Sequence, residues 1–334
     1  MNLYRHILKK SLRITWENKF LWFFGFFATF LGGFGAYEIL INRTDAYFAQ
    51  NLFFRFQHLQ ELNVFSGEFF LNVGRTFQVS PISMSIVFAL LIILLILFIF
   101  LLWLAVVSQV GLVFSSAKIV NSDKNAHKLN IKRGIETGID HFWPVLGLNF
   151  LSKVLVYFLF FCLSLFFVFL VSPGNGWVAD MFYVVLFIIF IPIALIISFI
   201  FNYAICYISI EKKEFKESIL DAWNLFLRNW LVTLEMALIL FVITFLATMV
   251  FILAAIILSV PILLFVNFLL YWGDGGISFW VIIASGILLG ALMAVVGAII
   301  TTFRISSWTT LFLHLNSKKE SPSKIVRLAE KIKN

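Results

Sequence analysis

Three ionisable side chains in or beside long apolar stretches are the strongest candidates for chemistry in this sequence. Lys153 and Glu235 interrupt hydrophobic runs, and Arg304 stands at the end of another. A charge at the centre of a membrane helix costs roughly 2.5 to 3.5 kcal/mol on insertion scales, so such residues commonly mark pathways for substrates, ions or protons. Glu235 paired with Lys153 or with Arg304 would line a polar cavity that opens to the cytoplasm.

A structural interpretation of the same charges stays open. The flexible stem of a lysine can carry its ammonium group back to the lipid headgroups, so Lys153 can reach water from within a membrane helix. Each charge would then be solvated separately, or a pair of opposite charges would clasp two parts of the fold together.

The motifs of common enzymes and metal sites do not occur in the sequence. It contains no HExxH, no GxSxG, no glycine-rich phosphate loop followed by Lys and Ser or Thr, and no CxxC. Its five histidines are scattered, and its two cysteines, Cys162 and Cys206, lie in separate apolar runs. We therefore predict no catalytic residues, no metal site, no cofactor and no disulfide framework.

The composition indicates that lipid surrounds most of the chain. Hydrophobic residues make up 62% of the 334 residues and charged residues only 13%, whereas soluble domains are about half apolar and about a quarter charged. The first apolar stretch, Phe20–Ile41, is too long for the core of a signal peptide, so we expect it to remain as a membrane helix.

The net charge of +8 comes from basic residues whose placement indicates membrane topology rather than nucleic-acid binding. Of the 25 Lys and Arg residues, 21 lie in four segments, and the apolar hairpins fall between these segments. Such clusters stay on the cytoplasmic side of a membrane, so both termini are expected in the cytoplasm. We predict a multi-pass protein of the bacterial cytoplasmic (inner) membrane. The four segments are Arg5–Lys19, Lys118–Arg133, Lys212–Arg228 and Arg304–Lys333.

Six apolar stretches are long enough to cross a bilayer as helices. About twenty residues at ~1.5 Å per residue span a hydrocarbon core of ~30 Å, and backbone groups in lipid must be paired within the helix. The sequence therefore predicts an all-α polytopic membrane protein with six transmembrane helices. The expected spans are Phe20–Ile41, Ile82–Val107, Phe142–Val171, Met181–Phe201, Trp230–Ser259 and Ile277–Phe303.

Further expectations concern the segments next to these spans. The second helix is expected to continue beyond Val107. Pro261 is expected to break the chain after the fifth span, so that Ile262–Trp272 forms an interfacial or re-entrant segment. The long outer loop, Asn42–Pro81, has apolar residues at helical spacing, which predicts a helix in the outer interface. These residues are Phe48, Leu52, Phe56 and Leu59.

Three polar segments that precede the odd-numbered spans can be aligned with one another. They are KSLRITWENKFLW from Lys10, RGIETGIDHFWPV from Arg133 and ESILDAWNLFLRNW from Glu217, the last with an additional helical turn. Each predicts an amphipathic helix in the membrane interface, where tryptophan is favoured. The expected anchors are Trp16, Trp143, Trp223 and Trp230. In the alignment Ser11, Gly134 and Ser218 correspond, as do Thr15, Gly138 and Ala222.

The returning spans correspond as well, because Gln109, Asn202 and Arg304 stand where each hydrophobic run gives way to mixed sequence. The chain would then consist of three helical-hairpin repeats, each starting in the cytoplasm with an interfacial helix. Chance similarity among short amphipathic helices is the alternative explanation. The expected repeats are residues 1–120, 121–213 and 214–316, followed by a basic tail at 317–334.

Rows of small residues predict where the first and last spans pack. Every fourth residue is small on both spans. The row on the first span is Gly25, Thr29 and Gly33, and the row on the sixth is Gly286, Gly290, Ala294 and Ala298. Small residues let helix backbones approach closely in lipid. Contact between these two spans would close the three repeats into a ring.

The partners that the sequence suggests are the lipid bilayer and its anionic headgroups. The tail from Asn316 to Asn334 carries six basic and two acidic residues, so it can rest on anionic lipid or stay in solution. A membrane-protein partner or a second copy of the chain is also compatible with the sequence, and nucleic acid is not expected.

The segment EKKEFKESILDAWNLFLRNWLVTLEMAL, Glu211–Leu238, and more distantly Asn130–Leu151 resemble part of a known family. The family is the glycerophosphoryl diester phosphodiesterase membrane domain, together with related bacterial multi-pass proteins of unknown function. The likeness covers residues 115–315 and implies a membrane architecture. The soluble, metal-dependent catalytic domain of the fused enzymes has no counterpart in this sequence, so the resemblance implies no phosphodiesterase activity and supplies no site residues.

The sequence therefore predicts an integral membrane protein without catalysis of its own, acting as a scaffold, accessory or permease-like component. One alternative is a transporter of small solutes or lipids with a polar cavity around Lys153, Glu235 and Arg304. A second alternative is an intramembrane lipid-modifying enzyme, although no paired carboxylates or histidine cluster share a common depth.

Overall fold

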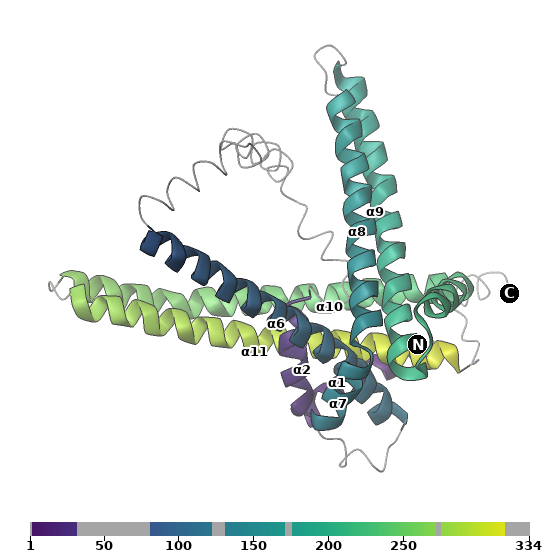
Figure 1. Ribbon diagram of the computed structural model, residues 1–334, viewed down its shortest axis with the longest axis horizontal. Coiled ribbons are helices and arrows are strands. Elements are labelled where there is room, and N and C mark those ends of the chain that lie inside the picture. The colour runs from purple at the N-terminus through teal and green to yellow at the C-terminus, as the bar shows by residue number, and fades with distance from the viewer. Residues whose placement is uncertain (1, 32–80, 122–130, 171–175, 272–274, 318–334) are drawn as a thin grey trace. The chain divides into compact units, whose positions relative to one another are not determined.

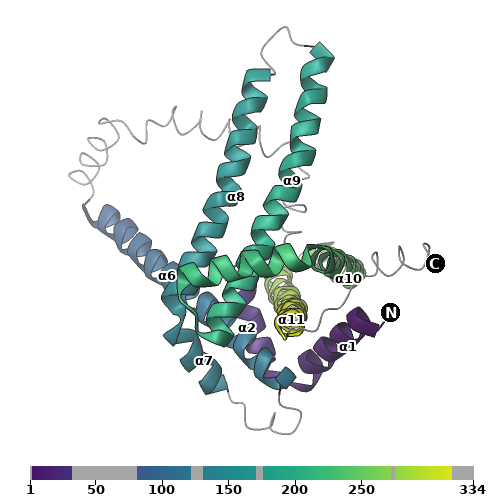
Figure 2. The same cartoon turned by 90° about the vertical axis from the view of Figure 1, so that its right-hand side faces the viewer.

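The computed structural model describes residues 2–31, 81–121, 131–170, 176–271 and 275–317, and these ranges are helical and contain no strand (Figures 1 and 2). This confirms the all-α class. The chain divides into two compact units. Unit 1 comprises residues 1–34, 105–152 and 197–334, and unit 2 comprises residues 35–104 and 153–196.

Five helices of the described residues are long and apolar enough to cross a membrane, so the chain has the architecture of a multi-pass membrane protein. A further apolar helix, α2 (Phe20–Thr29), has ten residues. The rest of the expected first span lies outside the described residues, and so do the outer-loop helix and the basic tail from residue 318. The five long helices are α6 (Pro81–Asn121), α8 (Phe142–Leu170), α9 (Gly176–Cys206), α10 (Phe215–Tyr271) and α11 (Gly275–Asn316).

The long helices separate an exposed apolar part from a buried part. At ~1.5 Å per residue, α6 and α11 are each about 60 Å long, roughly twice the thickness of a hydrocarbon core. In α11 the large apolar side chains are exposed from Phe279 to Val295, whereas most side chains from Ala298 to Leu315 are buried. Helix α6 likewise exposes its first half and, as expected, continues beyond Val107 to Asn121, where it is largely buried.

Helices α10 and α11 run side by side in both views, and so do α8 and α9 (Figures 1 and 2). Pro261 lies inside α10, and the helix continues through it to Tyr271. The expectation of a break there was wrong. Proline removes a single backbone hydrogen bond, and a long apolar helix tolerates that loss because its neighbours and local adjustments satisfy the freed carbonyl.

Three short amphipathic segments precede apolar helices, and each ends at a polar residue. They are α1 (Asn2–Glu17), α7 (Ile131–Asp140) and the first part of α10, in which Asn229 has non-helical dihedral angles of −133° and 28°. Asn18 donates to the carbonyl of Ile14 at 3.1 Å, and Asn229 donates to that of Leu225 at 3.2 Å. The Nδ1 atom of His141 lies 3.0 Å from the carbonyl oxygen of Thr137. The carbonyls of Ile14 and Thr137 also accept the backbone N–H groups of Asn18 and His141, so these side chains add a second contact at the end of each helix.

Candidate functional site: a polar core in unit 1

The buried polar side chains of the described residues all belong to unit 1, and we call them the polar core. Most carry small hydroxyl groups, and one is charged. Buried polar groups need hydrogen-bond partners, so their bonding decides what such a core can do. The polar core consists of Ser11, Thr15, Ser108, Gln109, Ser115, Ser116, Asn202, Ser209, Ser218, Thr233, Thr244, Thr301, Thr302, Arg304, Ser306, Ser307, Thr309 and Thr310.

Many hydroxyls of the core are satisfied within their own helices. In α11, four hydroxyls donate to the carbonyl four residues earlier at 2.7 to 2.9 Å. This arrangement removes the need for water beside a buried Ser or Thr. Ser108 and Ser209 differ, because their buried hydroxyls have no hydrogen-bond partner within the described part of the chain. The four residues of α11 are Thr302, Ser307, Thr309 and Thr310.

Other core residues join neighbouring helices of unit 1. Asn149 of α8 donates to Gln109 of α6 at 2.7 Å, and the hydroxyls of Tyr203 and Thr233 lie 2.8 Å apart between α9 and α10. Between α11 and α2, Thr302 donates to the carbonyl of Leu21 at 3.2 Å. Each joint therefore connects a helix that corresponds to an even-numbered span with one that corresponds to an odd-numbered span.

Two of these three joints are reinforced by small residues of the short segments. On α7, a Cβ atom added at Gly134 would lie 3.3 Å from the hydroxyl of Ser115, and one added at Gly138 would lie 2.5 Å from the Val107 carbonyl, both on α6. On α1, Ser11 donates to Thr310 of α11 at 3.4 Å. The six aligned residues of the three short segments are all buried. They are Ser11, Thr15, Gly134, Gly138, Ser218 and Ala222.

Aromatic rings fill the space between α9 and α11. The ring of Trp308 lies 5.5 Å from that of Phe199 and 6.0 Å from that of Tyr203. The indole nitrogen of Trp308 is buried without a hydrogen-bond partner among the described residues, so this side chain contributes packing. Helix α11 also meets α6, where the hydroxyls of Ser116 and Ser306 lie 2.9 Å apart. Helix α11 therefore contacts both α9 and α6.

The three predicted charges occupy different surroundings. Arg304 is nine-tenths buried on α11, and Glu235 of α10 is partly exposed and accepts a hydrogen bond from the hydroxyl of Tyr4 on α1. Lys153 belongs to unit 2 and is exposed. Pairing of Glu235 with Arg304 or with Lys153 stays a prediction. Nothing in the sequence indicated Tyr4, because hydrophobic patterns do not reveal which distant helix supplies a phenol.

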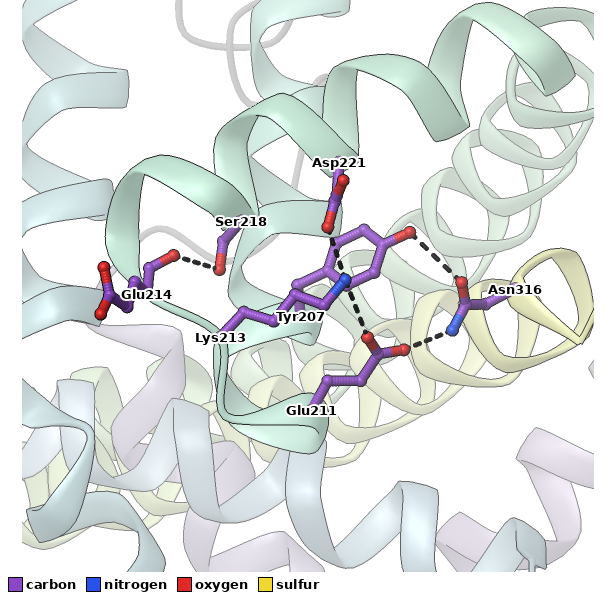
Figure 3. Close-up of polar contacts among 7 residues, drawn as sticks. All are labelled: Tyr207, Glu211, Lys213, Glu214, Ser218, Asp221 and Asn316. Atoms are coloured by element: carbon purple, nitrogen blue, oxygen red, sulfur yellow. Dashed lines mark hydrogen bonds and ion pairs between the residues drawn. The ribbon is translucent and has the colours of Figure 1, made fainter.

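A lysine clasp, which we define as Lys213 with Glu211 and Asp221, lies between α9 and α10 (Figure 3). The π-helix η2 (Tyr207–Glu211) ends at Lys212 in a left-handed conformation with φ of 57°, and Lys213 follows. The Lys213 ammonium contacts both carboxylates, at 3.3 Å for Glu211, and stands 4.7 Å from the centre of the Tyr207 ring.

The lysine clasp extends to the end of α11. Asn316 donates to Glu211 and accepts a hydrogen bond from the Tyr207 hydroxyl at 3.3 Å (Figure 3). The hydrogen bond to Asp221 holds the pKa of Lys213 well above its ordinary value; desolvation opposes this shift and Glu211 reinforces it. No sequence spacing pointed to this cluster, because it combines a π-helical turn with a residue more than one hundred positions away.

Of the glycines predicted to pack, one lies at a close helix contact, and the predicted tryptophan anchors are exposed. A Cβ atom added at Gly25 would lie 2.1 Å from Thr302 Oγ1 and 2.4 Å from the Ala298 carbonyl oxygen, so α2 and α11 pack closely there. At Gly286 and Gly290 an added Cβ would meet no atom within 4 Å, and Gly33 lies outside the described residues. The side chains of Trp16, Trp143, Trp223 and Trp230 are all exposed.

On the described part of the chain, no three His, Cys, Asp or Glu side chains come together closely enough to hold a metal ion. Comparisons of the chain with protein-family models, with curated proteins and with solved structures found no match.

Proposed function

We propose that the chain is a six-span protein of the bacterial cytoplasmic membrane, built from three helical-hairpin repeats that close into a ring, with both termini in the cytoplasm. In this proposal it acts as a membrane scaffold, accessory or permease-like component and carries out no catalysis of its own. The observation that carries the proposal is the recurrence of one type of helix contact in cyclic order.

The cyclic order follows from the joints of the polar core. The contact of α6 with α7 and α8 joins the first repeat to the second through Gln109 and Asn149. The bond between Tyr203 and Thr233 joins the second repeat to the third. The contact of α11 with α1 and α2 joins the third repeat back to the first, through Thr302 and Ser11 among others. Each returning helix thus packs on the helices that begin the next repeat, which supports a closed ring.

The bonding of the polar core supports a scaffold more than a transport path. A path for polar solutes needs groups that can exchange their partners, whereas most hydroxyls on α11 are bonded to their own backbone. Arg304 lies among these side chains, beyond the part of α11 that exposes large apolar residues. Glu235 of α10 stands between the exposed Leu234 and Leu238, and its carboxylate bonds to Tyr4 of α1. The positions of Arg304 and Glu235 favour a structural role, in which these charges hold helices together at the end of the spans.

The resemblance of Glu211–Leu238 to the membrane domain of glycerophosphoryl diester phosphodiesterases agrees with this architecture. That segment contains Ser218 and Ala222, which are buried, and Trp223, which is exposed. The short helix therefore has a side with small residues that packs inward and a side with Trp223 that faces outward. An interfacial helix in front of a span requires such a division.

Cysteine accessibility tests the proposal. Ser116→Cys and Ser306→Cys place thiols in the polar core, and Glu217→Cys places one on the exposed side of the third short segment. All three are made in a chain whose native Cys162 and Cys206 are replaced by Ala. A membrane-impermeant thiol reagent should label Glu217→Cys in inverted vesicles and not in intact cells, and it should leave both core thiols unlabelled on either side.

Labelling of the core thiols in folded protein would overturn the scaffold proposal. It would instead favour the transporter alternative, for which the burial of a charged Arg304 is the supporting observation. Labelling of Glu217→Cys from outside intact cells would contradict the proposed orientation.

A further inference from the structure

The three short segments, α1, α7 and the first part of α10, resemble one another in packing but differ in charge. Each turns small residues inward, and an exposed tryptophan lies within the segment or, for α7, just after it at Trp143. Helix α1 carries four basic residues and one acid, whereas α7 carries two of each. The first part of α10, residues 215–228, also carries two basic and two acidic residues. Helix α1 alone among the three therefore has a net positive charge.

The basic residues of α1 form a row on its exposed side. Arg5, Lys9 and Arg13 are each four residues apart and all exposed, so they lie along one face with a spacing of ~6 Å. Leu12 and Trp16 are exposed beside them. The single acid, Glu17, lies 3.6 Å from Arg13 at the end of the row and compensates only that cation.

The opposite side of α1 fixes the direction in which this row points. Ser11 bonds to Thr310, and Lys10 donates to the carbonyl of Val120 at 2.9 Å. Near the start of the helix, Tyr4 bonds to Glu235. Lys10 is thus held in a hydrogen bond to a neighbouring helix. The three exposed cations, Arg5, Lys9 and Arg13, face outward.

We propose that the exposed face of α1, comprising Arg5, Lys9, Leu12, Arg13 and Trp16, binds the anionic phospholipid headgroups of the bilayer in which the chain sits. The proposal rests on the membrane topology given above. Its chemistry is that of an interfacial helix, in which cations meet lipid phosphates while a tryptophan and a leucine enter the boundary of the acyl region. Lipid is the occupant because the apolar helix α2 begins at Phe20, three residues after α1 ends, which keeps this face at the membrane surface.

The preference for anionic lipid should be substantial and sensitive to salt. A basic residue near a charged membrane contributes about a fivefold preference, so three give up to about a hundredfold at low ionic strength. Screening reduces this preference as salt is added, because exposed charges interact weakly beyond ~10 Å in 0.1 M salt.

Spin-labelled lipids measure the preference directly. The full chain is reconstituted in phosphatidylcholine, and the fraction of motionally restricted probe is compared for spin-labelled phosphatidylglycerol and spin-labelled phosphatidylcholine. The test variant carries Arg5→Gln, Lys9→Gln and Arg13→Gln. The matched control carries Lys132→Gln, Arg133→Gln and Lys216→Gln, which removes the same charge from the other two short segments. The test variant should lose most of the selectivity for phosphatidylglycerol, and the control should keep it.

A charge-conserving variant, Arg5→Lys with Arg13→Lys, should retain the selectivity and shows that the lost charge is the cause. Equal loss in the test variant and the matched control would overturn the proposal. So would selectivity that survives in the test variant but disappears when residues 318–334 are removed, because the tail would then be the site. Selectivity of the unaltered chain that does not change with salt would also contradict it. None of these results affects the accessibility of the core thiols, so the scaffold proposal is tested separately.

Discussion

The contact between α2 and α11 can be tested at Gly25 with a single methyl group. An added Cβ would lie 2.4 Å from the carbonyl oxygen of Ala298, whereas ordinary contact begins at 3.4 Å, so the two helices must separate by about 1 Å. Overpacking of this kind typically costs about 1–3 kcal/mol. The hydroxyl of Thr302 would also have to leave its position between two carbonyls, those of Ala298 and Leu21.

We therefore expect Gly25→Ala to lower the free energy of unfolding by about 1–3 kcal/mol, even though alanine favours a helix over glycine by about 1 kcal/mol. Reversible unfolding by dodecyl sulfate in mixed micelles, followed by circular dichroism, measures the change. Gly290→Ala is the matched control, since an added Cβ there meets no atom within 4 Å and only the gain in helix propensity applies.

A second substitution separates the two contacts at Gly25. Thr302→Ala removes the nearer atom but leaves the Ala298 carbonyl, so it should relieve only part of the cost of Gly25→Ala. Such a partial effect appears as a coupling energy between the two substitutions in a double-mutant cycle. If Gly25→Ala proves as stable as Gly290→Ala, the close contact of α2 with α11 and the ring that depends on it are refuted.

Two further predictions concern other joints of unit 1. The effects of Tyr203→Phe and Thr233→Val on the free energy of unfolding should be coupled by about 0.6 kcal/mol, and at most about 1.7 kcal/mol, because these are the values of hydrogen bonds between membrane helices. Additive effects in the double-mutant cycle would mean that the two hydroxyls, 2.8 Å apart, do not interact. Lys213→Met should destabilise the chain at neutral pH. Since folding raises the pKa of Lys213, the stability it adds is fully present below the ordinary value of 10.5 and is lost as the pH rises through the raised value. Unfolding curves at a series of pH values should therefore show a constant difference from the unaltered chain up to that range, and a difference that instead vanishes near pH 7 would contradict the assignment.

The existence of the long helices follows from the sequence, but the direction of their side chains does not. In a soluble helix the apolar residues mark the buried side, because the other side faces water. In a lipid-exposed helix both sides are apolar, so the pattern loses this information. The predicted row of Gly286, Gly290, Ala294 and Ala298 illustrates the loss. Helix α2 meets α11 at Ala298, the last residue of the row, and at Thr302, whereas a Cβ atom added at Gly286 or Gly290 would meet no atom within 4 Å.

Polar residues carried more information about position. Gln109, Asn202 and Arg304 stand where hydrophobic runs end in the sequence, and all three are buried in unit 1. The aligned small and hydroxyl-bearing residues of the short segments, among them Gly134 and Ser218, are buried too. A polar or small residue in an apolar helix is costly unless it packs against another helix or forms a hydrogen bond. Its position in the sequence therefore indicates where helices meet. Local patterns do not reveal which helices meet. That depends on contacts between residues distant in the sequence, such as Tyr4 and Glu235.

The junctions between short and long helices explain how the polar core is assembled. A continuous helix through Asn18, His141 or Asn229 would keep the small residues of the short segment in line with the lipid-facing span. The break changes the direction of the chain, and the polar side chain at each junction contacts a carbonyl in the last turn of the short segment. A short segment can then lie against another helix of unit 1, as α1 does against α11 at Ser11 and α7 does against α6 at Gly134. In the third segment the junction comes one helical turn later than in the other two, which matches the additional turn in its sequence and leaves Ser218 and Ala222 in the buried positions.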